Sequence, residues 1–191
     1  MPSGKKASSN DVYQLKLTLK YIKPPIWRRL QVRGDTNLGD LHYIIQSAMG
    51  WDNSHLHEFK FGKESYADPE FELDGPFGGR GVKDENRTIL NAVARRKGAK
   101  FLYEYDFGDG WEHEILVEKI LAPEAGVRYP RCVKGARACP PEDCGGPWGY
   151  PNILHALANP KDPESAELLE WLGPHFDPEA FDLKRINRKL K

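Results

Sequence analysis

The chain has 191 residues, of which 39% are hydrophobic and 29% are charged. This composition excludes wholesale disorder and collagen-like or coiled-coil architecture, and the length fits one domain that folds without disulfides or a structural metal. Lys plus Arg and Asp plus Glu both number 28, so the formal net charge is zero and the chain lacks the basic excess of a dedicated nucleic-acid binder.

The N-terminal residues are polar and lack the apolar core of a secretory signal. We therefore expect a disordered tail over residues 1–11 and a single folded domain over residues 12–191. No apolar run approaches the roughly 18 residues that a membrane span needs. Three cysteines are an odd number and too few for a disulfide framework. These features predict a cytoplasmic protein that has no membrane partner.

The first half of the chain predicts two strands, a helix and a third strand. Apolar and polar residues alternate over Val12–Tyr21 and Ile26–Val32, which indicates a hairpin of half-buried strands. A helix is predicted over Thr36–Met49, with its first residue as the N-cap and Gly50 at its C-terminal end. His55–Phe61 alternates again and predicts a strand. This strand–strand–helix–strand opening resembles a β-grasp arrangement.

The second half combines short elements with long loops. We expect a short strand, a short capped helix and a hairpin of two strands, in the order Phe71–Leu73, Thr88–Arg95, Lys100–Phe107 and Trp111–Leu121. Five prolines and all three cysteines lie in Pro123–Gly149, which is predicted to be irregular. Three helices that each begin with a proline are predicted at the end: Pro151–Ala158, Pro163–Leu172 and Pro178–Leu190.

These elements predict the α+β fold class. We expect a mixed, largely antiparallel sheet of about five strands with the helix Thr36–Met49 packed on one face. The C-terminal helices are expected to wrap this sheet, so they do not form a domain of their own.

The cysteine-bearing segment is the first candidate for chemistry. Cys132, Cys139 and Cys144 lie in a Pro/Gly-rich segment, where irregular backbone can turn several thiolates toward one point. A tetrahedral zinc site needs four ligands, so His113 or His57 would have to complete it. The paired CxxC spacing of zinc ribbons is absent. The alternatives are three reduced, partly buried cysteines that act as small hydrophobic residues, or a redox pair.

The segment Tyr105–Glu114 is the second candidate. It places four acids, one histidine and three aromatic residues around a predicted hairpin turn. Carboxylates such as Asp106 beside the imidazole of His113 are suited to general acid–base catalysis or to holding a divalent cation. In the alternative interpretation Asp and Gly only form the turn, Trp111 packs in the core and the glutamates are solvated.

Two further patterns have a functional and an ordinary interpretation. His55 and His57 lie two residues apart on a predicted strand, so both side chains point to one side, as metal ligands can. A structural pair bonded to backbone is the alternative. The basic runs Trp27–Arg29 and Arg95–Lys97 could grip phosphates and stack on bases, or form a solvated edge.

Several motifs occur together in a characteristic order. They are Pro25–Arg29, Ala48–Trp51, His55–Phe59, Tyr105–Asp109 with Trp111 and His113, and Cys139–Gly146 running to Gly149–Tyr150. With them the chain resembles the plasmid pRiA4b Orf-three-like family over about residues 12 to 180. The resemblance implies an α+β domain associated with plasmids and mobile elements, and it implies no established catalytic residue.

Two function hypotheses follow. In the first, the chain is a non-enzymatic binding or adaptor module associated with plasmid or mobile-element biology. Its segment Pro130–Tyr150 would present a surface to a protein or nucleic acid, with zinc held by the three cysteines and His113. In the second, the chain is a metal-dependent, hydrolase-like enzyme whose catalytic residues line one pocket: His57, Asp106, His113 and Glu142. The hypotheses differ in whether these side chains converge.

Overall fold

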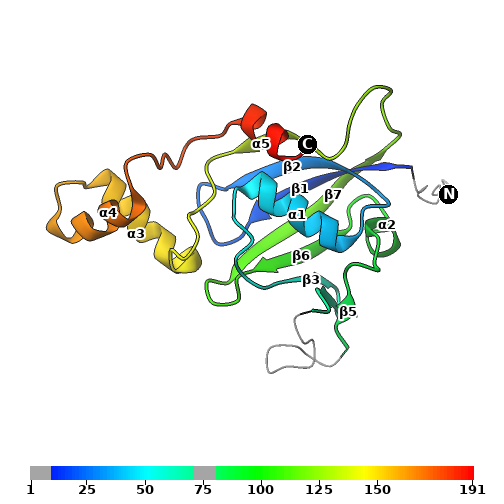
Figure 1. The fold of residues 1–191 in the computed structure, drawn as a ribbon, viewed down its shortest axis with the longest axis horizontal. Helices are drawn as coiled ribbons and strands as arrows, with labels where there is room; N and C mark the ends of the chain where they lie inside the picture. The colour runs from blue at the N-terminus through cyan, green and yellow to red at the C-terminus, as the bar shows by residue number, and fades with distance from the viewer. Residues whose placement is uncertain (1–9, 71–80) are drawn as a thin grey trace.

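The computed structural model describes residues 10–70 and 81–191, and this part of the chain forms an eight-stranded sheet with helices (Figure 1). The strands are β1 (Val12–Leu19), β2 (Trp27–Arg33), β3 (His57–Phe61), β4 (Glu64–Ala67), β5 (Lys83–Asp84), β6 (Lys100–Tyr105), β7 (Trp111–Leu121) and β8 (Arg131–Ala136). The helices are α1 (Leu38–Met49), α2 (Leu90–Val93), α3 (Gly146–Ala158), α4 (Ala166–Leu172) and α5 (Leu183–Lys189), with a 3-10 turn at Pro163–Ser165.

The sheet order is β5-β4-β3-β6-β7-β1-β2-β8. The pair β4–β5 is parallel and the other described pairs are antiparallel. The predicted α+β fold class with a mixed, largely antiparallel sheet and C-terminal helices is therefore confirmed. The hairpin β1–β2 is also present, but β6 and β7 lie between it and β3.

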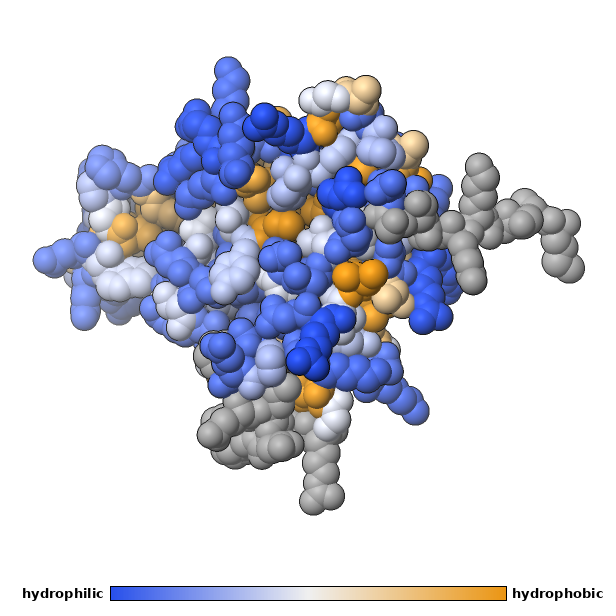
Figure 2. Space-filling model, turned by 45° about the vertical axis from the view of Figure 1, so that its right-hand side comes forward, coloured by the Kyte–Doolittle hydropathy of each residue, from blue (hydrophilic) through white to orange (hydrophobic). Residues whose placement is uncertain are grey.

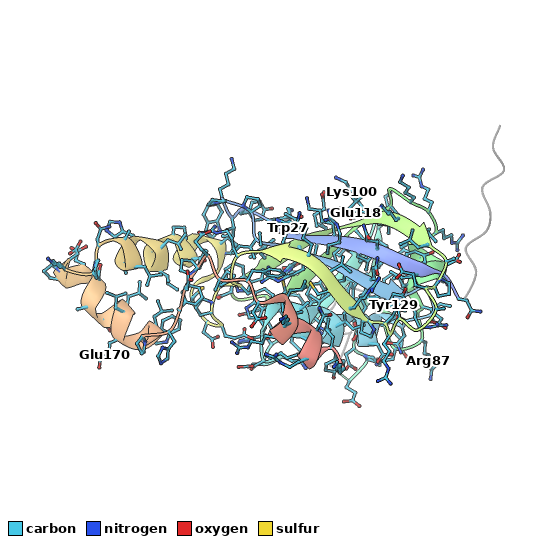
Figure 3. The ribbon with its side chains drawn as sticks, turned by 90° about the horizontal axis from the view of Figure 1, so that it is seen from above. Trp27, Arg87, Lys100, Glu118, Tyr129 and Glu170 are labelled. Carbon is cyan, nitrogen blue, oxygen red and sulfur yellow. The ribbon has the colours of Figure 1, made fainter. Side chains whose placement is uncertain are left out.

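The core lies between the sheet and α1. Leu15 and Leu17 of β1 are fully buried, and Leu41 and Ile45 of α1 are buried with them in one hydrophobic cluster. In Figure 3, α1 and α5 lie on one side of the sheet, and the labelled Trp27 lies on the other side. The face of the molecule drawn in Figure 2 is mostly hydrophilic and carries only small hydrophobic groups. From Leu15 to Leu19, the alternation in β1 thus separates fully buried side chains from partly exposed ones.

The N-cap of α1 is Asn37, one residue after the predicted Thr36. The Asn37 side-chain oxygen accepts a hydrogen bond from the Asp40 amide at 2.6 Å, which satisfies one free N–H of the first turn. Thr36 instead uses its carbonyl to accept a bond from the Leu90 amide. The predicted C-terminal glycine is confirmed, because Gly50 has φ +104° and closes the helix.

Two predictions about the C-terminal half are wrong. β8 lies within the segment predicted to be irregular and pairs with the edge of β2. Among its six residues Cys132 alone is buried, so its sequence shows little alternation of apolar residues. The helices α3 and α4 pack on each other and extend away from the sheet, and α5 packs against β8 and α1 (Figure 1). The expectation that the C-terminal helices wrap the sheet therefore holds for α5 alone.

The remaining predictions concern segments at the edge of the described structure. The predicted strand Phe71–Leu73 lies outside the described residues, as does most of the predicted tail 1–11. No described helix has the length and apolar character that crossing a membrane requires.

Candidate functional site

A cleft of about 850 Å³ opens beside α1, the start of β3 and the β6–β7 turn. Its described lining consists of five groups of residues: His42 with Tyr43, residues 53–57, residues 68–70, Glu85 with Asn86, and residues 106–108. Two of the predicted catalytic residues, His57 and Asp106, thus lie at one cleft. This cleft is the candidate functional site.

A group of metal-ligating side chains surrounds His55 at the cleft. One ligand atom from each of His55, Asp106 and Asp143 lies within 4.8 Å of the others, and no other group of three or more His, Cys, Asp or Glu residues does so in the described chain. The His55 Nε2 lies 3.2 Å from Asp143 Oδ1, 3.7 Å from Asp106 Oδ2 and 3.9 Å from Glu142 Oε2. The arrangement places one imidazole nitrogen among three carboxylates.

Two buried atoms of this group have no hydrogen-bond partner. His55 Nε2 and Glu142 Oε2 are both shielded from solvent, and neither forms a hydrogen bond within the described structure. The Asp106 side chain is nine-tenths buried, and the hydrogen bonds it accepts, from the amides of Gly108 and Asp109, both go to Oδ1. Its Oδ2 is therefore left facing His55. Buried polar groups are normally hydrogen-bonded, so these atoms are candidates for contact with a ligand.

Two tight turns position the carboxylates. Asp106 has φ +55° and its carbonyl accepts a bond from the Gly110 amide at 2.6 Å, which closes the β6–β7 turn. Asp143 has φ +54°, and Gly145 and Gly146 that follow it also have positive φ. Asp tolerates this left-handed conformation better than most residues because its short side chain bonds locally. A Cβ on Gly146 would lie 2.0 Å from the Asp109 carbonyl, so the two turns are packed directly together.

Glu142 is oriented by two other hydrogen bonds. Its Oε1 accepts the Asp52 amide at 2.8 Å and the Tyr105 hydroxyl at 3.1 Å. Burial, together with the negative charge of Glu142, raises the pKa of Tyr105. The hydroxyl therefore stays protonated and donates a hydrogen bond to Glu142. The free Oε2 of Glu142 is thereby turned toward His55.

A stacked pair of histidines forms another part of the cleft wall. The rings of His42 and His57 are 3.5 Å apart and nearly parallel. The carboxylate of Glu85, which is 1% exposed, can only accept a hydrogen bond, so His57 Nε2 donates to it at 2.9 Å. Sequence reasoning did not identify Glu85, because it lies in no motif and reaches His57 only through the fold.

His42 is held in its neutral form. Gln46 donates to the Tyr103 hydroxyl, which in turn donates to His42 Nδ1 at 2.7 Å, and His42 Nε2 donates to the side-chain oxygen of Asn53. Burial and the neighbouring His57 lower the pKa of His42 to about 3. Burial and His57 therefore keep the imidazole neutral, and the Tyr103 hydroxyl fixes its tautomer by donating to Nδ1.

His113 lies in the core and does not reach the cleft lining. It is 0% exposed, and its Nδ1 contacts the Tyr103 carbonyl at 3.3 Å. Burial lowers the pKa of His113 to about 4. Side chains alternate along β7, and His113 shares the inward face with Trp111. The four predicted catalytic residues thus separate: His57 and Asp106 line the cleft, Glu142 joins the His55 group, and His113 is buried elsewhere.

The three cysteines and His113 do not converge into a metal-ligating group in the described chain. Cys132 lies on β8 with its thiol near the Lys134 carbonyl, Cys139 precedes a Pro-Pro pair, and Cys144 lies in the turn before α3. Burial raises the pKa of all three thiols. They are free and at least partly buried, as small hydrophobic residues would be.

The basic run at β2 is engaged within the protein. Arg28 is 2% exposed and donates to the carbonyls of Trp27, Ala48 and Ala136. Arg29 forms a two-bond ion pair with Glu118, which lies on the open face of the sheet with Lys100 (Figure 3). Neither arginine presents an unpaired guanidinium for phosphate binding.

The structure assigns the central position to His55 and adds Asp143, whereas the sequence analysis selected His57. The turn signals of Asp109-Gly110 and Asp143-Cys144-Gly145 were available in the sequence, because Asp and Gly favour tight turns. They predict where the chain reverses. They do not predict that the two turns meet.

Comparisons with known proteins agree with the fold. A family model described as plasmid pRiA4b ORF-3-like protein matches residues 11–185. The uncharacterized protein y4hQ of Sinorhizobium fredii is 41% identical over 181 residues, covering 94% of this chain and 90% of that protein. The crystal structure of a protein of unknown function, MM3350 from Methanosarcina mazei Go1, superposes with a TM-score of 0.81 at 39% identity, covering 93% of this chain and 98% of that one.

Proposed function

The chain belongs to the plasmid pRiA4b ORF-3-like protein family, and from its geometry we propose that it is a divalent-metal-dependent, hydrolase-like enzyme whose metal binds at His55, Asp106 and Asp143. The observation that carries the proposal is the pair of buried atoms, His55 Nε2 and Glu142 Oε2, which form no hydrogen bond in the described structure. A buried polar atom without a partner costs free energy, and one cation would satisfy both atoms together with the free Asp106 oxygen.

The distances suit a metal ion. Ligands about 2.1 Å from a tetrahedral ion lie ~3.4 Å from each other. The contacts of His55 Nε2 with Asp143, Asp106 and Glu142 are 3.2, 3.7 and 3.9 Å, so the side chains need only small shifts to bind. One imidazole nitrogen with carboxylate oxygens is a donor set that favours Zn²⁺ or Mn²⁺ over softer ions.

The neighbouring cleft supplies the space that an enzyme needs. Zn²⁺ held by these residues would lower the pKa of a bound water to about 7 and so would supply a nucleophile at neutral pH. Because Asp106 belongs both to the ligand group and to the cleft lining, the ion would lie at the cleft wall. A substrate in the 850 Å³ cleft would therefore meet the activated water directly.

The metal is tested by titrating the chelator-treated full-length protein with Zn²⁺ and with Mn²⁺ by calorimetry. We expect about one ion per chain for the wild type and at least a tenfold weaker affinity for His55→Ala and for Asp143→Asn. His155→Ala is the matched control, because His155 also faces a carboxylate, Asp162, at 3.9 Å but is 66% exposed on α3. An unchanged affinity in His55→Ala would overturn the site.

The enzymatic half has its own test. The metal-loaded protein should hydrolyse p-nitrophenyl acetate faster than the chelator-treated protein does, and the increase should disappear in His55→Ala. Equal rates with and without metal would contradict the proposed hydrolase activity and would support metal binding only.

A second candidate function, the binding or adaptor module, is favoured by one specific observation. Trp148 is 82% exposed and stacks on Tyr21, which is 59% exposed, with ring centroids 6.3 Å apart. Exposed paired aromatic residues are typical anchors of protein interfaces. Trp148 lies in the segment Pro130–Tyr150 that the adaptor hypothesis selects. Loss of a partner upon Trp148→Ser with unchanged metal affinity would favour this function.

A further inference from the structure

The cleft has an uneven distribution of charge. Four carboxylates line it, from Asp68, Glu70, Glu85 and Asp106, and its described lining contains no lysine or arginine. His42 adds no positive charge, because its low pKa keeps it neutral. A divalent ion at the His55 group would offset two of the four carboxylate charges in the described lining and leave the other two.

The carboxylates have different partners. Glu85 is bonded to His57, and the nearly buried Asp106 leaves its Oδ2 without a hydrogen-bond donor in the described chain. Within the described residues, Asp68 accepts a hydrogen bond from the Glu70 amide alone, and neither Asp68 nor Glu70 forms an ion pair. The negative charge of Asp68 and Glu70 is therefore available to a ligand.

Aromatic rings lie beside these charges. Tyr43 and Phe107 both line the cleft and are 58% and 38% exposed, although large aromatic side chains are usually more buried. Aromatic faces attract ammonium and guanidinium groups, and the attraction adds to that of nearby carboxylates. Phosphate or carboxylate groups would instead be repelled by the charges of the wall.

We propose that the substrate of the cleft carries a positively charged amine or guanidine group, which is bound between the carboxylates of Asp68 and Glu70 and the rings of Tyr43 and Phe107. This inference rests on the proposed function, since it names the substrate class of that enzyme. The cationic group anchors the substrate, and the bond to be hydrolysed lies toward His55.

Three small probes of one shape separate the effect of charge from that of size. Benzylamine, benzyl alcohol and benzoate share a ring and differ in charge at neutral pH. NMR titration of the full-length protein is expected to show benzylamine binding at least fivefold more tightly than benzyl alcohol, with benzoate weakest. Raising the salt concentration from about 50 to 500 mM should weaken the binding of benzylamine but not that of the other two probes, because screening reduces attraction between charges.

Variants locate the binding group. The double variant Asp68→Asn, Glu70→Gln should lose at least fivefold in benzylamine affinity while its affinity for benzyl alcohol stays unchanged. Glu170→Gln is the matched control, because Glu170 is an exposed carboxylate on α4, away from the cleft (Figure 3). Benzoate binding as tightly as benzylamine, no binding of benzylamine, or an unaffected double variant would each overturn the proposal.

The outcome can be separated from that of the metal titration. The probes are measured first on chelator-treated protein, where the charge of the cleft is most negative and no ion is required. A cleft that prefers benzylamine but binds no Zn²⁺ or Mn²⁺ would overturn the metal and keep the cationic ligand. A cleft that binds the metal but shows no preference among the probes would keep the metal site and overturn the cationic ligand.

Discussion

Acidification from pH 8 to pH 5 should destabilise this protein through two buried histidines. His42 is 2% exposed and His113 is 0% exposed, and burial lowers their pKa values to about 3 and about 4. Both imidazoles are therefore neutral in the folded protein at pH 5. In the unfolded chain the pKa of each returns to the ordinary value of 6.5, so there they bind a proton.

The sign and size follow from proton linkage. Because the unfolded state binds more protons below pH 6.5, the free energy of unfolding falls as the pH falls from 6.5 toward the folded pKa values. At pH 5 each histidine lowers the stability by about 2 kcal/mol relative to pH 8, and the two together by about 4 kcal/mol. That is a large part of the 5–15 kcal/mol by which domains are stable.

The assay is urea denaturation of chelator-treated protein at pH 8, 6.5 and 5. Between pH 8 and pH 5 the free energy of unfolding should fall by about 2 kcal/mol less in His42→Asn, and likewise in His113→Asn, than in the wild type. This holds whatever the stability of each variant is at pH 8. His155→Asn should leave the pH dependence unchanged, because His155 is 66% exposed. If either buried-site variant kept the full pH dependence of the wild type, the neutral state assigned to that histidine would be wrong.

Two further substitutions test the packing around the site, both by urea denaturation at pH 8. Arg28→Met should lower the free energy of unfolding by about 3 kcal/mol, because three buried or partly buried carbonyls lose their donor. Arg29→Met, which breaks a partly exposed ion pair, should lower it by about 1 kcal/mol or less. Gly146→Ala should lower the free energy of unfolding by about 3 kcal/mol or more, because a positive φ is combined with a clash against backbone. Gly126→Ala is the control: it has a positive φ but open space around it and should lower the stability by about 1 kcal/mol.

The regular elements were predictable because their side-chain periods are local. β1 alternates in the sequence, and from Leu15 to Leu19 it also alternates in burial. The apolar residues that predicted α1 are mostly its buried ones. β8 was missed for the same reason. Its pairing with β2 is set by a partner strand about a hundred residues away, and its own residues carry little alternation.

The histidine that occupies the centre of the ligand group was not predictable from the same signals. From the sequence, His55 and His57 are equally good candidates for the metal ligand, since both lie on one side of an extended segment. Glu85 distinguishes them, because its carboxylate binds His57, whereas His55 Nε2 forms no hydrogen bond in the described structure. Glu85 is brought there by its own backbone, whose carbonyl accepts the Leu38 amide at the start of α1. No local pattern contains that contact.

The ligand group itself depends on a meeting of two turns. Asp106 and Asp143 each have a positive φ, and the turns that contain them are pressed together where Gly146 touches the Asp109 carbonyl. A side chain at position 146 would clash with the Asp109 backbone and push the two turns apart. Glycine is therefore required there to bring the charges together as well as to turn the chain. Two adjacent carboxylates repel each other, so this close packing stabilises an arrangement that a cation would complete.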